Sequence, residues 1–363
     1  ENVRGGSGTN TIRGSAADNV MTGGASTDNF FGSLGSDTYT GNGGSNTLDY
    51  SELSSGNIDV RWNGATNTVN KGAGGTDSFS GVQTINGSIL ATDTLTLLVA
   101  GLTVQSSGAY FSPDALATLI GVENVEGSTG ADTIHAMNTG TIDNTINGNG
   151  GNDIIYGGDG NHTLDGGLGT DTLRFGSASA ITFNLTASTA AFATYTNNFS
   201  GFEEYYLGSG DDTVTGSAGN DGLVRGENGN DTFLVSAGAD SFDGGGGTDT
   251  YDFNGAAGAI NVNMTLGSNQ VIDDGFGNTE TITSIENISG TNLADTITGS
   301  TVANTLLGRD GNDILSGDAG DDTISGGNDD DTISGGADND TLNGDAGDDT
   351  ISGGAGVDVI DGG

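Results

Sequence analysis

A nine-residue repeat is the feature that most constrains how this chain can fold. From Gly290 to Asp361, eight nonapeptides follow one another without insertions. Each begins with glycine, has Asp or Asn at its sixth position and has Ile or Leu at its eighth. A short fixed period of this kind is typical of solenoid proteins, in which every repeat packs against its neighbours rather than folding alone.

Weaker copies of the same unit occur in three other parts of the chain. We therefore expect repeat blocks at 1–49, 127–174, 207–252 and 290–363, separated by interposed β-segments at 50–126, 175–206 and 253–289. The sixth position in these blocks is most often an aspartate: Asp28, Asp37, Asp132, Asp153, Asp171, Asp212, Asp221, Asp231, Asp240, Asp249, Asp295, Asp313, Asp322, Asp331, Asp340, Asp349 and Asp358. Elsewhere it is Asn10, Asn19, Asn46, Asn144, His162 or Asn304.

The repeat unit has a direct physical interpretation. Glycines at positions 1, 2 and 4 allow positive φ and close backbone approach, so the first six residues are expected to turn. The last three residues, usually Thr-Ile-Ser in the final block, then form a very short strand whose middle side chain faces inward. Two units complete one coil, and coils stack about 4.8 Å apart. Position-6 carboxylates from units two apart should therefore meet across adjacent coils.

The charge of the chain indicates a bound cation. There are 49 acidic and 7 basic residues, for a formal charge of −42, and there is no cysteine to form a disulfide. Two carboxylates about 4.8 Å apart repel each other by about 3 kcal/mol at an effective dielectric near 20. Hard oxygen ligands in loose geometry favour Ca²⁺ over zinc or magnesium. Since a block of n units offers n − 2 places between coils, the four blocks should hold at most about 15 calcium ions.

These nonapeptides resemble the RTX (repeats-in-toxin) family, whose pattern is GGxGxDxUx. The resemblance is most specific from Gly308 to Asp361 and weaker in the other blocks. It implies a parallel β-roll, calcium binding outside the cell, and export in an unfolded state through a type I secretion channel. It also implies that the position-6 aspartates are the calcium ligands, and that a site is weakened or lost where Asn or His replaces Asp.

The interposed segments predict strands of a second kind. Residues 58–62, 181–185 and 260–264 alternate apolar and polar side chains, as half-buried strands do. These strands could cap and widen the solenoid core, or they could form a binding face on which Trp62 or Tyr205-Tyr206 stacks against a sugar.

One helix is expected among these strands. Ser112-Pro113-Asp114 has the pattern of a helix start and Gly121 that of a stop, which predicts a short helix over 113–120. The fold class is therefore all-β, a parallel β-roll interrupted by wider β-segments with this one helix.

Several function classes are disfavoured by the same sequence. No basic stripe is present to contact phosphates, so nucleic acid is not an expected partner. The longest apolar run, near Leu95–Val99, is too short to span a bilayer. No HExxH, GxSxG, catalytic cysteine or P-loop lysine occurs, so we expect no catalytic residues and no enzyme activity. His135 and His162 belong to different coils, which disfavours a transition-metal site.

Two functions remain from different classes. The first is a secreted, calcium-dependent structural protein similar to RTX-type surface-layer proteins or adhesin shafts, which associates with itself or with a cell-surface glycan. The second is the calcium-triggered folding and secretion module of a longer enzyme or toxin. The chain begins at Glu1 rather than Met and stops early in a further repeat, so we expect it to be a mature or excised portion. A catalytic domain preceding Glu1 would favour the second function.

Overall fold

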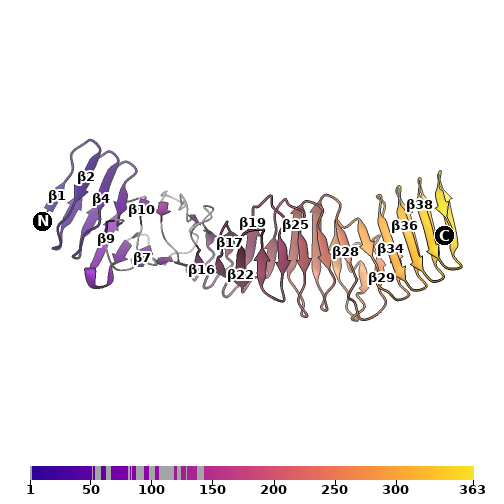
Figure 1. Ribbon diagram of the computed structural model, residues 1–363. Helices are drawn as coiled ribbons and strands as arrows, with labels where there is room; N and C mark the ends of the chain where they lie inside the picture. Colours follow the sequence, from indigo (N-terminus) through magenta and orange to yellow (C-terminus); the bar gives the residue numbers. More distant parts are fainter. Residues whose placement is uncertain are drawn as a thin grey trace. The chain divides into compact units, whose positions relative to one another are not determined.

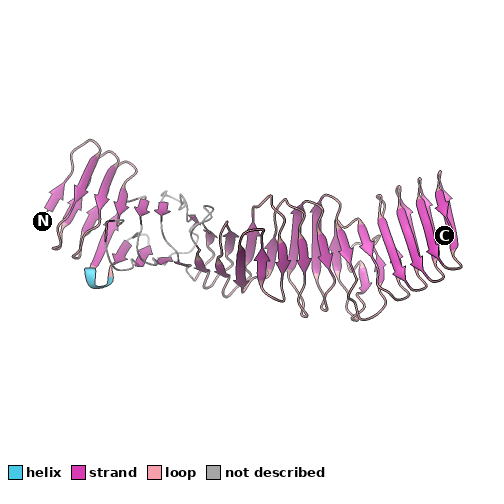
Figure 2. Ribbon diagram, viewed as in Figure 1, coloured by secondary structure: helices cyan, strands magenta, loops and turns pink. Residues whose placement is uncertain are grey.

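A computed structural model describes most of the chain. The described residues are 2–50, 52–53, 59–62, 67–80, 82, 84–86, 94–97, 103–105, 118–120, 124–127, 129–136 and 143–363. In this part the secondary structure is short β-strands apart from one 3₁₀ turn, η1 (Gly72–Gly74), drawn in cyan in Figure 2. None of the helical structure described there has the length and hydrophobicity needed to cross a membrane. The all-β fold class is confirmed.

The chain forms two compact units. Unit 1 comprises Glu1–Phe175 with Tyr195–Phe202, and unit 2 comprises Gly176–Thr194 with Glu203–Gly363. The strands of unit 1 are β1 (Asn2–Arg4), β2 (Asn10–Arg13), β3 (Val20–Thr22), β4 (Asp28–Phe31), β5 (Thr38–Thr40), β6 (Thr47–Asp49), β7 (Asp59–Trp62), β8 (Asn67–Asn70), β9 (Thr76–Ser80), β10 (Thr84–Asn86), β11 (Thr94–Leu97), β12 (Thr103–Gln105), β13 (Thr118–Ile120), β14 (Asn124–Glu126), β15 (Thr133–His135), β16 (Thr145–Asn147), β17 (Ile154–Gly157), β18 (Thr163–Asp165), β19 (Thr172–Phe175) and β22 (Thr196–Ser200).

Unit 2 contains the remaining strands. They are β20 (Thr182–Asn184), β21 (Thr189–Ala191), β23 (Glu204–Tyr206), β24 (Thr213–Thr215), β25 (Leu223–Asn228), β26 (Thr232–Leu234), β27 (Ser241–Gly246), β28 (Thr250–Asp252), β29 (Asn261–Asn263), β30 (Val271–Asp273), β31 (Thr281–Thr283), β32 (Asn287–Ser289), β33 (Thr296–Thr298), β34 (Thr305–Asp310), β35 (Ile314–Ala319), β36 (Thr323–Asn328), β37 (Thr332–Ala337), β38 (Thr341–Ala346), β39 (Thr350–Ala355) and β40 (Val359–Asp361).

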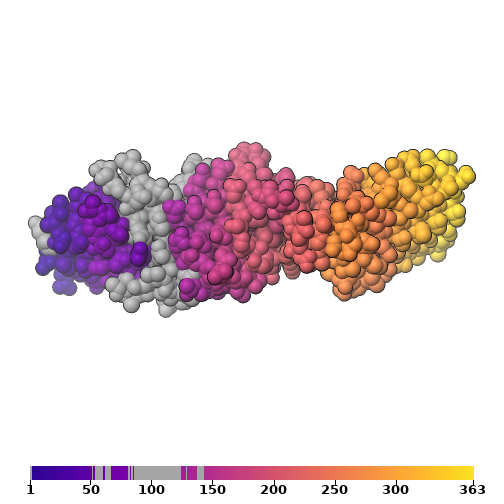
Figure 3. Space-filling view, turned by 90° about the horizontal axis from the view of Figure 1, so that it is seen from below, coloured from indigo at the N-terminus to yellow at the C-terminus, as the bar shows by residue number. Residues whose placement is uncertain are grey.

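The coil is made of two nonapeptides, as the sequence predicts. In residues 290–363, called the terminal block here, each strand pairs in parallel with the second strand along the chain. Ile324 of β36 therefore lies opposite Leu342 of β38. Figure 1 shows these strands side by side, coloured from orange to yellow, and in Figure 3 the atoms of the terminal block form one continuous packed surface in the same colours.

Position 8 supplies the core of the roll. In the terminal block the position-8 side chains are at most 1% exposed from the first coil to Leu342: Ile297, Leu306, Leu315, Ile324, Ile333 and Leu342. Aromatic residues take the same position in the block before it, where the Phe242 ring lies 5.1 Å from that of Phe233 and 5.5 Å from that of Tyr251. A stack of buried apolar side chains thus runs along each unit, as the period predicts.

The interposed segments extend this core through antiparallel hairpins. β7, β8 and β9 pair in this way, as do β20 with β21 and β29 with β30. Val60, Phe183 and Val262 are all fully buried, which confirms that these strands are half-buried. Tyr205 is also buried and packs on the Phe183 ring at 5.2 Å, whereas the side chain of Trp62 lies outside the described residues.

Two expectations about local structure need correction. The predicted helix over 113–120 is wrong for its last three residues, because Thr118–Ile120 forms β13 and pairs in parallel with β10. Ladder hydrogen bonds outweigh the weak local helix signal there, and residues 113–117 lie outside the described part. The predicted strand length of three residues is also too short for the terminal block. There β36 has six residues, because Gly327 and Asn328 still pair with the next coil.

Candidate metal centres

The position-6 side chains form columns along the roll. In the terminal block one column contains Asp295, Asp313, Asp331 and Asp349, and the other contains Asn304, Asp322, Asp340 and Asp358. The Oδ1 atom of each later member accepts a hydrogen bond from the backbone N–H of the member before it. For example, Asp313 N–H donates to Asp331 Oδ1 at 2.8 Å, and Asp322 N–H donates to Asp340 Oδ1 at 3.0 Å. The sequence predicted that these residues meet, but not that one oxygen of each carboxylate holds the backbone of the adjacent coil.

For many of these aspartates the other carboxylate oxygen is left without a protein donor, whereas Asp295 Oδ2 accepts from Thr291 N–H at 2.6 Å. In the part of the chain that the structure describes, buried Oδ2 atoms without a hydrogen-bond donor include those of Asp153, Asp231, Asp249, Asp313, Asp322, Asp331, Asp340 and Asp349. A buried carboxylate oxygen that lacks a donor is costly and needs a proton or a cation. These atoms therefore mark where a cation would stabilise the coil.

Glycine at position 1 leaves the space beside each orphaned oxygen. A Cβ on Gly308 would stand 2.2 Å from Asp313 Oδ2 and 2.4 Å from the carbonyl oxygen of Gly326, which begins the corresponding unit of the next coil. The same arrangement recurs at Gly317, where the carboxylate is Asp322 and the carbonyl is that of Gly335. A carboxylate oxygen and a backbone carbonyl from adjacent coils therefore converge on a point that a side chain would fill.

At positions 2 and 4, glycine is needed for its backbone freedom rather than for its lack of a side chain. Gly327 at position 2 and Asp329 at position 4 have φ values of 120° and 79°. Positive φ is thus required at these two positions, while position 1 requires the absence of a side chain. Asp tolerates this conformation better than most residues, which explains why it can replace glycine at position 4.

Burial and mutual repulsion raise the pKa of many of these carboxyls. Burial, opposed by the hydrogen bond from the preceding coil and reinforced by neighbouring aspartates, raises the pKa of Asp313 to about 7. Burial likewise raises the pKa of Asp231 to about 7 and that of Asp153 to about 6. In the absence of a cation, the ionised form of these carboxyl groups is therefore unfavourable.

The oxygen-rich donor set fits calcium. In the part of the chain that the structure describes, no three His, Asp or Glu side chains gather closely enough to hold a metal by themselves. The carboxylate oxygen and the backbone carbonyl that converge beside each position-1 glycine are both oxygen donors, which suit a hard cation with flexible coordination and are not the ligands that zinc prefers. The position-6 residues are the ones that would hold the ion, together with carbonyls such as that of Gly326.

The structure places the seventeen predicted aspartates in these columns at different depths. Fourteen are buried, and Asp221, Asp349 and Asp358 are half-buried. Those of the first block differ in their partners: both oxygens of Asp28 accept hydrogen bonds, from Asn10 and from Gly24 N–H.

Column members in the interposed segments were not predicted. Asp77 Oδ1 accepts from Asp37 N–H at 2.8 Å, Asn197 Oδ1 from His162 N–H at 3.1 Å, and Glu286 Oε2 from Asp249 N–H at 2.8 Å. Each precedes a triplet such as Ser-Phe-Ser or Asn-Ile-Ser that resembles the end of a nonapeptide. An acid or amide before such a triplet is the signal that could have identified them.

Glu280 is a further unpredicted member. It lies opposite Asp240, since Ser241 pairs with Thr281, and its side chain is 1% exposed. Its Oε2 accepts from the Tyr251 hydroxyl at 2.6 Å, while Oε1 is buried without a donor. Burial raises the pKa of Glu280 to about 8.

The two histidines have local roles. His162 takes a column position and its Nδ1 accepts from Asn144 N–H at 2.9 Å, so it replaces the Asp oxygen as a hydrogen-bond acceptor. His135 stacks on Tyr156 with ring centroids 4.0 Å apart, and burial lowers its pKa.

A second ladder at position 5 faces solvent. Asp330 Oδ1 accepts from Asp348 N–H at 2.9 Å, and Asp321 Oδ1 accepts from Asn339 N–H at 2.9 Å. These side chains contact the following coil, whereas position-6 side chains contact the preceding one. Because they are exposed, they are satisfied by water as well and do not require a cation.

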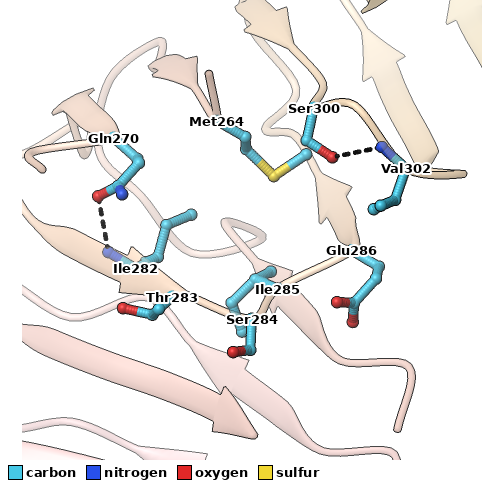
Figure 4. Close-up of a pocket in the computed structure, with 9 residues that line it drawn as sticks. All are labelled: Met264, Gln270, Ile282, Thr283, Ser284, Ile285, Glu286, Ser300 and Val302. Carbon is cyan, nitrogen blue, oxygen red and sulfur yellow. Dashed lines mark hydrogen bonds between the residues drawn. The ribbon is translucent and has the colours of Figure 1, made fainter. Parts of the chain in front are cut away.

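A shallow pocket lies beside the Glu286 column in unit 2. Figure 4 shows Met264, Gln270, Ile282, Glu286 and Val302 around a cavity of about 260 Å³. Its walls are held by hydrogen bonds from Ile282 N–H to Gln270 Oε1 at 3.2 Å and from Val302 N–H to Ser300 Oγ at 3.3 Å. Its one carboxylate, Glu286, already accepts from Asp249 N–H.

Two solved structures show a distant likeness to this chain. The crystal structure of the extracellular lipase LipA from Serratia marcescens aligns with 77% of this chain and 38% of the lipase, at 18% identity and a TM-score of 0.15. The chain thus spans well under half of that protein. A hyperactive, Ca²⁺-dependent, β-helical antifreeze protein from an Antarctic bacterium aligns with 97% of this chain and 83% of its own, at 18% identity and a TM-score of 0.17. At these TM-scores neither likeness bears on function.

Sequence comparison identifies the family. No curated protein sequence matches the chain. The RTX calcium-binding nonapeptide repeat (4 copies) matches residues 4–39, 31–49, 119–139, 138–173, 200–227, 225–257, 289–324, 307–342 and 334–363. These stretches cover more than half of the sequence and contain all seventeen of the predicted position-6 aspartates. The chain therefore belongs to the family of RTX calcium-binding nonapeptide repeat proteins.

Proposed function

We propose that this protein is an extracellular structural protein whose β-roll folds on calcium and assembles into a cell-surface layer, filament or adhesin shaft. The observation that carries the calcium-dependent step is the set of buried Oδ2 atoms without donors, which recurs from Asp313 to Asp349 in consecutive coils. A roll that needs a cation at every coil folds only where calcium is abundant, as it is outside the cell.

The residues of each coil have separate roles in this process. The Oδ1 atom of Asp331 holds the register of the preceding coil through Asp313 N–H. Its Oδ2 atom and the carbonyl of Gly344 face the space at Gly326, where a Cβ would stand 2.2 Å from the former and 3.0 Å from the latter. Calcium, when bound, supplies the positive charge that offsets the repulsion between carboxylates of adjacent coils.

Assembly is supported by the chemistry of the exposed faces. The outward-facing position-7 residues of the terminal block, such as Thr323 and Thr341, form rows in parallel register. Repetitive polar faces present the same groups at every coil, so a second copy can contact many of them at once. The stacked coils also make the solenoid elongated along its axis within each unit, which suits a spacer or lattice element.

Calcium titration followed by electron microscopy of the same sample tests the proposal. We expect circular dichroism to show a cooperative gain of β-structure with calcium, and micrographs in millimolar calcium to show ordered polymers or sheets. A chain that is equally sheet-rich after complete calcium removal would refute the calcium-dependent step. A protein that folds with calcium but stays monomeric at high concentration would refute the assembly step and favour a folding module.

A further inference from the structure

Lys71 occupies an unusual place in unit 1. It is the only lysine of the chain, it follows β8, and its residue is 4% exposed. Its Nζ lies 2.5 Å from Asp77 Oδ1, 2.5 Å from the carbonyl oxygen of Ser33 and 3.6 Å from Asp37 Oδ2. A buried ammonium thus contacts two carboxylates and one turn carbonyl.

These three oxygens belong to adjacent coils. Asp37 and Asp77 are successive members of one column, because Thr38 pairs with Ser78 and Asp37 N–H donates to Asp77 Oδ1 at 2.8 Å. Ser33 is position 2 of the nonapeptide that contains Asp37. The ammonium therefore lies between coils and contacts the classes of oxygen that converge beside the position-1 glycines of the terminal block.

The carboxylates of Asp37 and Asp77 also accept hydrogen bonds from hydroxyl groups. Asp37 Oδ2 accepts from the Ser33 hydroxyl at 2.9 Å and from the Tyr39 hydroxyl at 3.2 Å. Asp77 Oδ2 accepts from the Tyr50 hydroxyl at 2.6 Å. In the terminal block the equivalent oxygens of Asp313 and Asp331 have no donor.

Side-chain amides also donate hydrogen bonds to the carboxylates of the first block. Asn10 Nδ2 donates to Asp28 Oδ1 at 2.6 Å, and Asn19 Nδ2 donates to Asp37 Oδ1 at 3.0 Å. Although burial would raise it, the pKa of Asp28 is brought below its ordinary value by the hydrogen bonds from the side chain and backbone N–H of Asn10 and from Gly24 N–H. Replacing Asp by Asn at position 6 removes a calcium ligand and supplies a donor for the next carboxylate.

We propose that the Lys71 ammonium supplies, between these two coils, the positive charge that an inter-coil calcium ion supplies elsewhere, and that the coils around Asp37 and Asp77 stay folded when calcium is removed. The inference rests on the proposed calcium-dependent folding of the other coils and refines it. It assigns the first block the role of a preformed end on which the calcium-dependent coils can stack.

Hydrogen exchange of the full chain with and without EGTA tests the wild-type protein. In EGTA we expect peptides covering 33–39 and 71–79 to exchange at least about tenfold more slowly than peptides covering 313–351. Equal, fast exchange of both sets would overturn the inference while leaving calcium-dependent folding intact. Equal, slow exchange of both sets would instead refute the proposed function.

A substitution tests the effect of the Lys71 ammonium separately from that of the hairpin that carries it. Lys71→Met keeps the length of the side chain and removes its charge, and Arg4→Met is the control, since it removes one charge from an exposed side chain of the same block. We expect Lys71→Met to lose the slow exchange in EGTA, to regain it in calcium, and to bind one more Ca²⁺ per chain in calorimetric titration. Slow exchange retained in EGTA, or lost without a gained ion, would overturn the assignment.

Discussion

Asp331→Asn should change the stability of the roll in opposite directions with and without calcium. Asn at position 6 keeps the column hydrogen bond, as Asn46 shows by accepting from Asp28 N–H at 2.8 Å. The substitution therefore removes the charge of Asp331 and the ion ligand at Oδ2 while preserving the contact with Asp313 N–H.

The changes in stability expected with and without calcium have different physical origins. At about 10 mM calcium and a site affinity of about 10⁻⁴–10⁻³ M, loss of one site should lower the free energy of unfolding by about 1.4–2.7 kcal/mol. Without calcium, burial raises the pKa of Asp331, and repulsion from Asp349 and, less strongly, from Asp329 and Asp330 adds to it. A pair of such charges about 4.8 Å apart costs about 3 kcal/mol at most, so its partial relief should stabilise the calcium-free coil by at least about 1 kcal/mol.

Thermal unfolding followed by circular dichroism measures both effects. The calcium-free roll can be populated with trimethylamine oxide, which favours compact states. Asp330→Asn is a matched control, because Asp330 is the adjacent residue, is exposed, and accepts a similar hydrogen bond from Asp348 N–H. A loss of stability of equal size in both conditions would show that Asp331 acts only as a hydrogen-bond acceptor, and the reasoning would be wrong.

Three further outcomes are expected. Because burial raises the pKa of Asp313 to about 7 and that of Asp322 to about 6, the folded state holds more protons than the unfolded chain between about pH 4 and 7. Stability of the calcium-free roll should therefore fall as pH rises through this window, and resin-stripped protein should gain β-structure by circular dichroism near pH 4.5; a gain on raising the pH would contradict this sign. Gly335→Ala would place a Cβ 2.2 Å from Asp340 Oδ2 and 2.6 Å from the Gly353 carbonyl, so chemical denaturation in calcium should show a loss of about 1–3 kcal/mol. Gly219→Ala, whose Cβ would meet only Ser217 Oγ at an ordinary contact distance of 4.0 Å, should be nearly neutral. Asp331→Ala should reduce the calcium stoichiometry measured by calorimetry, and Asp37→Ala should not, since Asp37 is paired with Lys71 and Tyr39; equal losses would show that the Asp37 column binds calcium.

Much of the fold could be predicted because the nine-residue period determines which side chains are buried and which strands pair. Position 8 fixes which side chain enters the core, and the nine-residue spacing fixes that Leu342 stacks beyond Ile324. Both follow from local sequence in a fold where each coil contacts only its neighbours. The helix predicted over 113–120 is wrong at 118–120, because a local start signal carries no information about the ladder that Thr118–Ile120 joins.

The column members of the interposed segments could not be predicted from the period. Asp77 follows Asp37 by 40 residues, Asn197 follows His162 by 35 and Glu286 follows Asp249 by 37. A hairpin of variable length separates each pair, so only the tertiary pairing of β9, β22 and β32 returns these residues to the column. The Lys71 contact is equally non-local, since Ser33 lies 38 residues before it.

The direction of the two ladders explains why the chain is more acidic than its calcium sites require. Position-6 oxygens accept from the preceding coil and most are buried, so their charge must be offset by a cation or by the donors that replace it around Asp28 and Asp37. Position-5 oxygens such as those of Asp321 and Asp330 accept from the following coil at the surface, where water screens them. Asn339 occupies the same ladder and accepts from Val357 N–H at 2.9 Å, so a neutral amide serves equally well there. The charge at position 5 is therefore not required by this ladder, and it adds acidic residues that the buried columns do not use.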